Sequence, residues 1–204
     1  MLLGLFISAF GASVATKARL GTSPVACCPV VYAAPLGVSV GMSMFLFNVI
    51  FLLAQIALER REFPLFHLLQ LIPAMLFGSL TDLTTILIGP LPAEGLPLRI
   101  AYCAVSIVMV GMGVFLLLRA NLLMMCTEAF DAVVSRKTGV EYGIVKIIKD
   151  VLLVCIAAAG SLIIDHRLVH VGFGTAAAAV FVGMVVRWLK RDKRLNGLID
   201  RVLG

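Results

Sequence analysis

Apolar runs long enough to cross a lipid bilayer recur along the whole chain, each bounded by charged residues, Pro or Gly. A membrane-spanning α-helix needs roughly 20 such residues. Hydrophobic residues fill 61% of the 204 positions and charged residues only 14%. Soluble domains are about half apolar and a quarter charged, and could not bury so much apolar surface. The runs therefore predict an all-α, multi-pass membrane protein whose main partner is the lipid bilayer.

The boundaries of these runs predict six transmembrane helices, three in each half of the chain. A turn-rich linker, residues 89–97, separates the halves. In the first half, residues 1–95, helices are expected at about 2–16, 40–58 and 65–88. In the second half, residues 96–204, they are expected at about 100–118, 142–164 and 168–189, followed by a basic tail.

Each half also contains a shorter helix that need not cross the membrane, at about 22–36 and 127–138. Thr22, Ser23 and Pro24 predict the start of the first, because a hydroxyl cap followed by Pro favours a first turn. The second is more polar and ends before Gly139. Two placements stay open: re-entrant within the bundle, or flat at the membrane interface.

Residues 11–49 recur without gaps as residues 113–151, at an offset of 102. Two near-matches join the identities, since Lys17 faces Arg119 and Asn48 faces Asp150. We interpret this as an internal duplication. With three spans in each copy, the halves would have opposite orientations, as in the inverted repeats of many secondary transporters. The identical positions in the first copy are Gly11, Ala18, Leu20, Gly37, Val38, Gly41 and Val49.

The positive charges predict the orientation of the chain. Six spans with the basic tail inside place both termini in the cytoplasm. The 17 Lys and Arg residues then lie on or near the cytoplasmic face, with four exceptions: Lys17, Arg19, Arg99 and Arg167. The net charge of +6 is thus a topology signal, and no nucleic-acid partner is expected.

Three ionisable residues lie one to two turns inside the predicted helix 142–164: Lys146, Lys149 and Asp150. Such groups cost a few kcal/mol or more in a bilayer unless they are paired or hydrated. Lys146 and Asp150 are four residues apart and share a helix face. Asn48 holds the symmetry-related position on the other side of the midplane. These residues either line a polar pocket or proton pathway, or form an ion pair that only fixes helix packing.

Two further candidates are less specific. Asp82 lies near the outer end of its helix, where it either pairs with Lys17 or Arg19 or contacts a substrate or proton. Thr22 and Ser23 lie at the start of the first short helix, whose free N–H groups would suit an anionic group. The alternative is that both short helices only plug the bundle.

The sequence contains no nucleophile triad, phosphate-binding glycine loop or metal-ligand spacing. The five cysteines all have apolar neighbours and none has a spacing typical of zinc or redox sites. We therefore expect no enzymatic activity, no catalytic residue, no metal and no cofactor.

Several short motifs recur in one pattern along the chain: residues 19–24, 37–41, Asn48, 119–122, Asp131, Gly139, Lys146, Asp150 and 172–175. Together they resemble the YczE/YyaS/YitT-type family of bacterial integral membrane proteins. The chain departs from that family's pattern at residues 122–126, Leu-Leu-Met-Met-Cys, where relatives usually continue Leu-Gly-x-Ser-Pro. The resemblance implies a protein of the bacterial cytoplasmic (inner) membrane.

The expected function is transport of a small polar or anionic solute, or an ion, through a central site between the two repeats. Two alternatives stay open: a non-transporting accessory or scaffold protein, and a substrate-capture subunit of a larger transport complex. A homodimer is compatible with so small a bundle.

Overall fold

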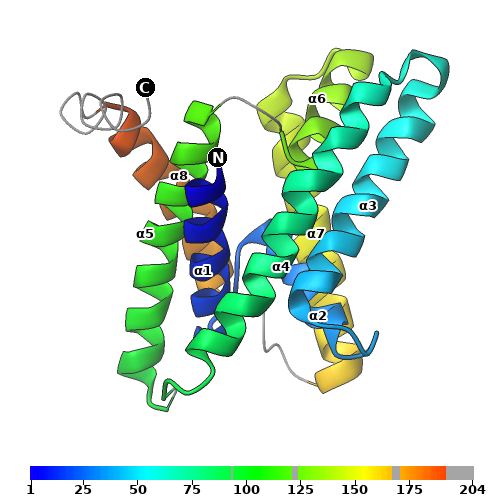
Figure 1. The fold of residues 1–204 in the computed structure, drawn as a ribbon. Helices are drawn as coiled ribbons and strands as arrows, with labels where there is room; N and C mark the ends of the chain where they lie inside the picture. The colour runs from blue at the N-terminus through cyan, green and yellow to red at the C-terminus, as the bar shows by residue number, and fades with distance from the viewer. Residues whose placement is uncertain (93, 121–123, 167–170, 192–204) are drawn as a thin grey trace.

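The computed structural model describes residues 1–92, 94–120, 124–166 and 171–191, and these form helices and turns with no strand (Figure 1). Two 3₁₀ segments, Arg60–Glu62 and Leu65–Gln70, join α3 to α4. The α-helices are α1 (Leu2–Ala18), α2 (Pro24–Ala33), α3 (Val40–Glu59), α4 (Leu71–Ile88), α5 (Leu96–Ala120), α6 (Cys126–Thr138), α7 (Tyr142–Asp165) and α8 (Phe173–Arg191).

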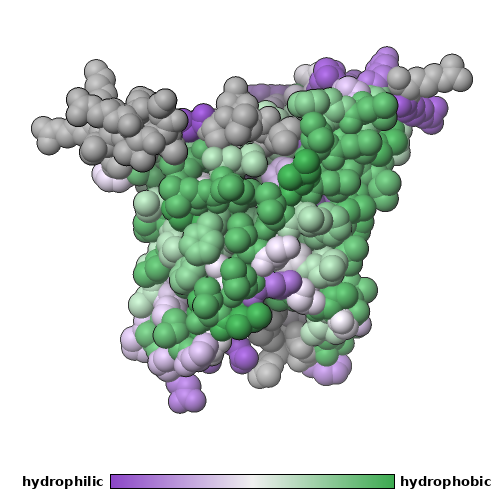
Figure 2. All heavy atoms as spheres, viewed as in Figure 1, coloured by the Kyte–Doolittle hydropathy of each residue, from purple (hydrophilic) through white to green (hydrophobic). Residues whose placement is uncertain are grey.

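Four helical stretches of the described chain are long and apolar enough to cross a membrane: 40–59, 65–88, 96–117 and 142–164. Residues 2–18, 24–33 and 173–189 form shorter apolar helices. Figure 2 shows a broad, mostly apolar band, with hydrophilic residues gathered towards its two ends. Large apolar side chains point outward, for example Ile86 on α4 and Trp188 on α8. This exposed apolar surface is consistent with a helical membrane bundle.

Some helix boundaries differ from the prediction. Helix α5 begins at Leu96, inside the predicted linker, because Pro97 is well tolerated in a first helical turn. The predicted helix 65–88 begins with a 3₁₀ segment, and α2 ends at Ala33, before Gly37 adopts a positive φ of 64°. The predicted start of the last helix falls on residues 167–170, which lie outside the described residues.

The helices pack as two groups. One group contains α1, α5 and α8, and the other contains α2, α3, α6 and α7. Helix α4 packs on α1 and on α3, and so joins the groups along one side (Figure 1). Helices α7 and α8 have no comparable contact along their described lengths. The bundle is therefore closed between α3 and α4 but not between α7 and α8.

Small residues set the closest helix contacts. A Cβ atom on Gly11 of α1 would lie 2.9 Å from the backbone nitrogen of Val110 on α5. In the α3–α4 contact, a Cβ on Gly78 would lie 2.6 Å from the carbonyl oxygen of Gly41. No real side chain fits at such distances. Glycine at these positions lets two backbones meet, as is common between membrane helices.

The helix boundaries repeat at the offset found in the sequence. Helices α6, α7 and α8 each begin 102 residues after α2, α3 and α4, respectively, and α5 ends 102 residues after α1. The contacts repeat as well: α1 packs on α4 as α5 packs on α8, and α2 packs on α7 as α6 packs on α3. The α3–α4 contact has no counterpart of similar extent, because α7 and α8 make no comparable contact along their described lengths.

Two of the sequence motifs meet in space. The loop after α1 lies against the start of α8, where Gly174 N–H donates to the Leu20 carbonyl over 2.8 Å. Gly21 has a φ of 116°, and a Cβ there would lie 2.5 Å from the Thr175 hydroxyl. A side chain at Gly21 would thus be both strained and crowded. This contact fixes the loop that leads into α2.

Candidate functional site

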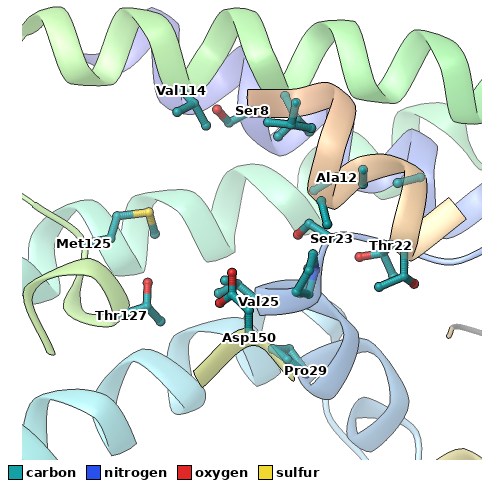
Figure 3. Close-up of a pocket in the computed structure, with 18 of the residues that line it drawn as sticks. Ser8, Ala12, Thr22, Ser23, Val25, Pro29, Val114, Met125, Thr127 and Asp150 are labelled. Atoms are coloured by element: carbon teal, nitrogen blue, oxygen red, sulfur yellow. The ribbon is translucent and has the colours of Figure 1, made fainter. Parts of the chain in front are cut away.

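A cavity of about 1200 Å³ lies between the two helix groups. All eight α-helices of the described chain contribute to its wall, α4 through Pro73 and Phe77. Five of the seven predicted site residues line it: Thr22, Ser23, Asn48, Lys146 and Asp150 (Figure 3 labels Thr22, Ser23 and Asp150). The sequence reasoning therefore selected residues from three separate segments that the fold brings to one cavity.

Helix α7 supplies the charged part of the wall. The Nζ of Lys146 lies 3.4 Å from one carboxylate oxygen of Asp150, in the predicted i, i+4 pair. The Nζ of Lys149 lies 3.7 Å from the other oxygen. Both Lys146 and Asp150 face the cavity, with side chains 40% and 21% exposed. Asp150 thus lies between two lysines and keeps access to the cavity.

Lys149 points away from the cavity, towards α6. Its Nζ lies 2.6 Å from the carboxylate of Asp131 and donates to the Thr127 carbonyl over 3.3 Å. The side chain of Asp131 is fully buried and that of Lys149 is 7% exposed. The ammonium group also lies 5.8 Å from the centre of the Phe51 ring. Lys149 therefore links α7 to α6. It does not line the cavity, although the sequence had selected it as a site residue.

Asn48 on α3 is almost fully buried and faces the cavity. Its side-chain nitrogen donates to the Met44 carbonyl over 2.9 Å, which fixes the orientation of the amide. The amide oxygen has no hydrogen-bond partner in the structure. Ser8 of α1, on the opposite wall, also has a buried hydroxyl without a partner. Buried polar atoms are rarely left unpaired, so both atoms could bind a polar group in the cavity.

The starts of both short helices reach the cavity. Figure 3 shows Asp150 between Thr127, in the first turn of α6, and Ser23, the residue before α2. Ser23 precedes Pro24 as predicted, but its side chain makes no capping hydrogen bond. The hydroxyl cap expected there is therefore absent. Helix α6 is not at the surface on all sides, because it packs on α3 and α7.

Glu128 lies in the first turn of α6 and lines the cavity. Burial raises the pKa of its carboxyl group above the usual range, while the nearby Lys146 and Lys149 ammonium groups oppose that rise. Helix α6 is not one of the spanning helices. In the described chain, Glu128 forms no ion pair within 4 Å. Its carboxyl group is thus a second titratable acceptor in the cavity.

The comparison with protein families matches residues 1–191 to the family described as "Family of unknown function (DUF6198)". The chain belongs to this family. The match covers every helix of the structure and gives the family no activity. The searches of curated proteins and of solved structures found no match. The resemblance to the YczE/YyaS/YitT-type family thus stays a prediction, and the geometry of the cavity carries the functional argument.

Asp82 lies outside the cavity of this DUF6198 protein. Its carboxylate accepts hydrogen bonds from the Gly41 N–H over 2.8 Å and from the Ser39 hydroxyl over 2.5 Å. The expected pairing with Lys17 is not observed, because Lys17 donates to the Gly89 carbonyl. Arg19 forms no ion pair with Asp82 in the described structure either. Asp82 therefore joins α4 to the start of α3 at their close glycine contact.

Two ion pairs of α6 were not predicted. Asp131 belongs to the second short helix, whose placement the sequence left open between re-entrant and interfacial, and the structure buries it against Lys149. Arg136, also on α6, donates to the buried carboxylate of Glu59 at the end of α3. Their partners are 18 and 77 residues away, so no local spacing could reveal them. No cluster of His, Cys, Asp and Glu suited to a metal ion occurs in the described residues.

Proposed function

We propose that this protein is a transporter that carries a small polar solute through the cavity, across the cytoplasmic membrane of a bacterium. The single observation that supports this most is a pair of oxygen atoms without a hydrogen bond on residues of the cavity wall. The amide oxygen of Asn48 and one oxygen of Asp150 have no hydrogen-bond partner, although both residues line a space of about 1200 Å³. Buried polar atoms that serve packing alone are rarely left without a hydrogen bond.

The repeated helix boundaries support an inverted duplication. In this proposal α1, α3, α4, α5, α7 and α8 are the six spans, and α2 and α6 are the two short helices of the repeats. Helix α1 begins and α8 ends at the same end of the bundle, the upper end in Figure 1. That arrangement agrees with an even number of spans and with both termini in the cytoplasm. Inverted repeats commonly place a substrate site at their interface, near the midplane.

The unequal α3–α4 and α7–α8 contacts suggest how the cavity would change its access. The first is closed, with Gly41 against Gly78 and Asp82 bonded to the start of α3. The second, its counterpart in the repeat, is open in the described chain. In alternating access, the two halves of an inverted repeat exchange conformations. The state with α7 and α8 in contact and α3 and α4 apart would then open the site to the other side.

Uptake by proteoliposomes tests the proposal. The protein would be reconstituted and offered labelled amines, amino acids and organic acids, with empty liposomes as the background. We expect uptake of at least one solute by the wild type, and loss of that uptake in Asp150→Asn and Asn48→Ala. Glu62→Gln is the matched control, because Glu62 is 79% exposed at its side chain and distant from the cavity. Uptake that persists in both cavity variants would refute the proposed site.

A non-transporting accessory role is the competing proposal, and the two ion pairs of α6 favour it. Lys149–Asp131 and Arg136–Glu59 hold α6 against α7 and α3. Pairs of this kind can serve packing specificity alone. These ion pairs do not account for two other residues that line the cavity. Glu128 forms no ion pair in the described chain, and the amide oxygen of Asn48 has no hydrogen bond. The two roles predict different outcomes of a charge swap on α7, described in the Discussion.

A further inference from the structure

The cavity has two unlike walls. Helices α1, α5 and α8 contribute mainly small and branched apolar residues, with hydroxyl groups only at Ser8, Ser106 and Thr175. Charged residues and the Asn48 amide come from the other helix group, on α3, α6 and α7. A ligand that satisfies both walls needs an apolar body and one polar end.

The polar wall offers mainly unused acceptors. Its one described amine at the cavity surface, Lys146, already pairs with Asp150. The amide nitrogen of Asn48 is used by the Met44 carbonyl, which leaves the amide oxygen. One carboxylate oxygen of Asp150 has no hydrogen bond, although the Nζ of Lys149 lies 3.7 Å from it. Glu128 forms no ion pair within 4 Å in the described chain. The hydroxyl groups of Thr22, Ser23 and Thr127 also line this side of the cavity. The buried atoms left without a hydrogen-bond partner there, Asn48 Oδ1 and Asp150 Oδ1, are nevertheless both acceptors.

The formal charges of the side chains that line the cavity also favour a cationic ligand. Among the charged side chains of the described residues that line the cavity, two are carboxylates, Glu128 and Asp150, and one is an ammonium group, Lys146. The positive ends of the short helices would favour an anion by themselves. However, Glu128 already lies in the first turn of α6, and Asp150 lies on α7, which packs on α2. The protein therefore supplies its own anions near these helix ends.

We propose that the solute is an amphipathic organic cation, a protonated amine attached to an apolar body. The ammonium group binds at the wall formed by Asn48, Glu128 and Asp150, and the apolar body packs on α5 and α8. This inference depends on the proposed function, because it names the chemical class of the transported solute. It replaces the expectation of an anionic solute, which the starts of the short helices had suggested.

The inference also predicts a link to protons. Burial raises the pKa of the Glu128 carboxyl group, so this group takes up a proton more readily than an exposed glutamate. The charged and titratable groups that face it are Lys146, Lys149 and Tyr142 on α7 and Asp131 on α6. An ammonium ion bound nearby favours the ionised carboxylate. At a pH where Glu128 is protonated, amine binding should therefore release a proton, and binding should weaken as the pH falls.

Calorimetric titration of the protein in nanodiscs of zwitterionic lipid tests the inference, with empty nanodiscs as the background. Three probes share one apolar body: 4-phenylbutylammonium, 5-phenylpentanoate and 4-phenylbutanol. We expect the amine to bind at least about tenfold more tightly than the other two, since a hydrogen bond to a charged group is worth about 1.5–3 kcal/mol. Asn48→Ala and Glu128→Gln should each weaken amine binding, and Glu62→Gln should not.

The outcomes separate the inference from the proposed function. Tighter binding of the carboxylate, lost in Asn48→Ala, would overturn the cationic class but leave a solute site in the cavity. Binding of none of the three probes above empty nanodiscs would overturn the amphipathic cation, whereas the proposed function depends on the uptake of other solutes. If a variant does not fold, the wild type is titrated in two buffers of different ionisation enthalpy. The difference in binding enthalpy then shows whether amine binding releases a proton. Amine binding without proton release would contradict the assigned site.

Discussion

The Nζ of Lys149 lies 2.6 Å from the carboxylate of Asp131, and this contact joins α7 to α6 inside the bundle. Both side chains are almost completely buried. Neither charge could be kept there alone, because an isolated ion in an apolar interior is strongly destabilising. The pair also positions the neighbouring residues: Thr127 and Glu128 precede Asp131 on α6, and Asp150 follows Lys149 on α7. A structural ion pair thus supports the polar wall of the cavity.

Removal of one partner of the Lys149–Asp131 pair should destabilise the protein more than removal of both partners. We expect Asp131→Asn to destabilise the protein by about 3–5 kcal/mol, because it leaves the Lys149 charge buried and unpaired. The double variant Asp131→Leu with Lys149→Met should recover much of this loss. Unfolding in mixed micelles of rising dodecyl sulfate content, followed by circular dichroism, measures both effects.

The exposed pair Lys137–Glu62 is the matched control for that experiment. Its two charged groups are 3.6 Å apart, and the Glu62 side chain is 79% exposed. Surface pairs contribute about 0–1 kcal/mol, so Glu62→Gln should change stability very little. Equal losses of stability in Asp131→Asn and Glu62→Gln would mean that the destabilisation does not come from a buried, unpaired Lys149 charge.

A charge swap on α7 should distinguish a solute site from a structural pair. In Lys146→Asp with Asp150→Lys, the i, i+4 pair is retained with its direction reversed. We expect the swapped protein to fold and to lose uptake, because the charge that meets the solute has changed sign. Uptake is measured in proteoliposomes, and folding by the melting temperature. A swapped protein with wild-type uptake would favour the accessory role instead.

Sequence reasoning found the helices and five polar residues of the cavity wall, because both depend on local signals. The 102-residue offset related Asn48 to Asp150 before any contact was known, and both residues line the cavity. The spacing of Lys146 and Asp150 predicted their pair, which lies at 3.4 Å. Helix periodicity decides which residues share a face, and the repeat decides which faces correspond.

The same reasoning failed where a contact depends on packing between distant segments. Asp131 shares a face with Glu128 and Ser135, which is also the pattern of a helix at a membrane surface. Only the position of α7 shows that Lys149 lies opposite Asp131. Asp82 likewise bonds to the start of α3, 41 residues away along the chain, and not to the expected cations. The sequence also does not show which glycines of different helices meet, as Gly41 and Gly78 do.

The close contact of α3 with α4 should depend on Gly41. A Cβ at this position would overlap the carbonyl oxygen of Gly78 and would lie 2.7 Å from the Asp82 carboxylate. We expect Gly41→Ala to cost about 1–3 kcal/mol, because the overlap is with backbone. Gly183→Ala on α8 is the control, since nothing lies within 4 Å of its added Cβ. That change should stabilise the helix by up to about 1 kcal/mol. Melting temperatures of both variants test the pair of predictions, and a harmless Gly41→Ala would contradict the close contact.

Stability should depend on pH through Glu128. Burial raises the pKa of this carboxyl group in the folded protein above its value in the unfolded chain, so the folded state binds the proton more tightly. The resulting stabilisation is complete below the unfolded pKa, near 4.5, and is lost as the pH rises through the higher folded pKa. In Glu128→Gln the side chain is neutral at every pH. We therefore expect the wild type to lose stability relative to Glu128→Gln as the pH rises above about 4.5. Melting temperatures across that range measure the difference, and Glu62→Gln should follow the wild type. Parallel curves for wild type and Glu128→Gln would show that Glu128 does not titrate differently on folding.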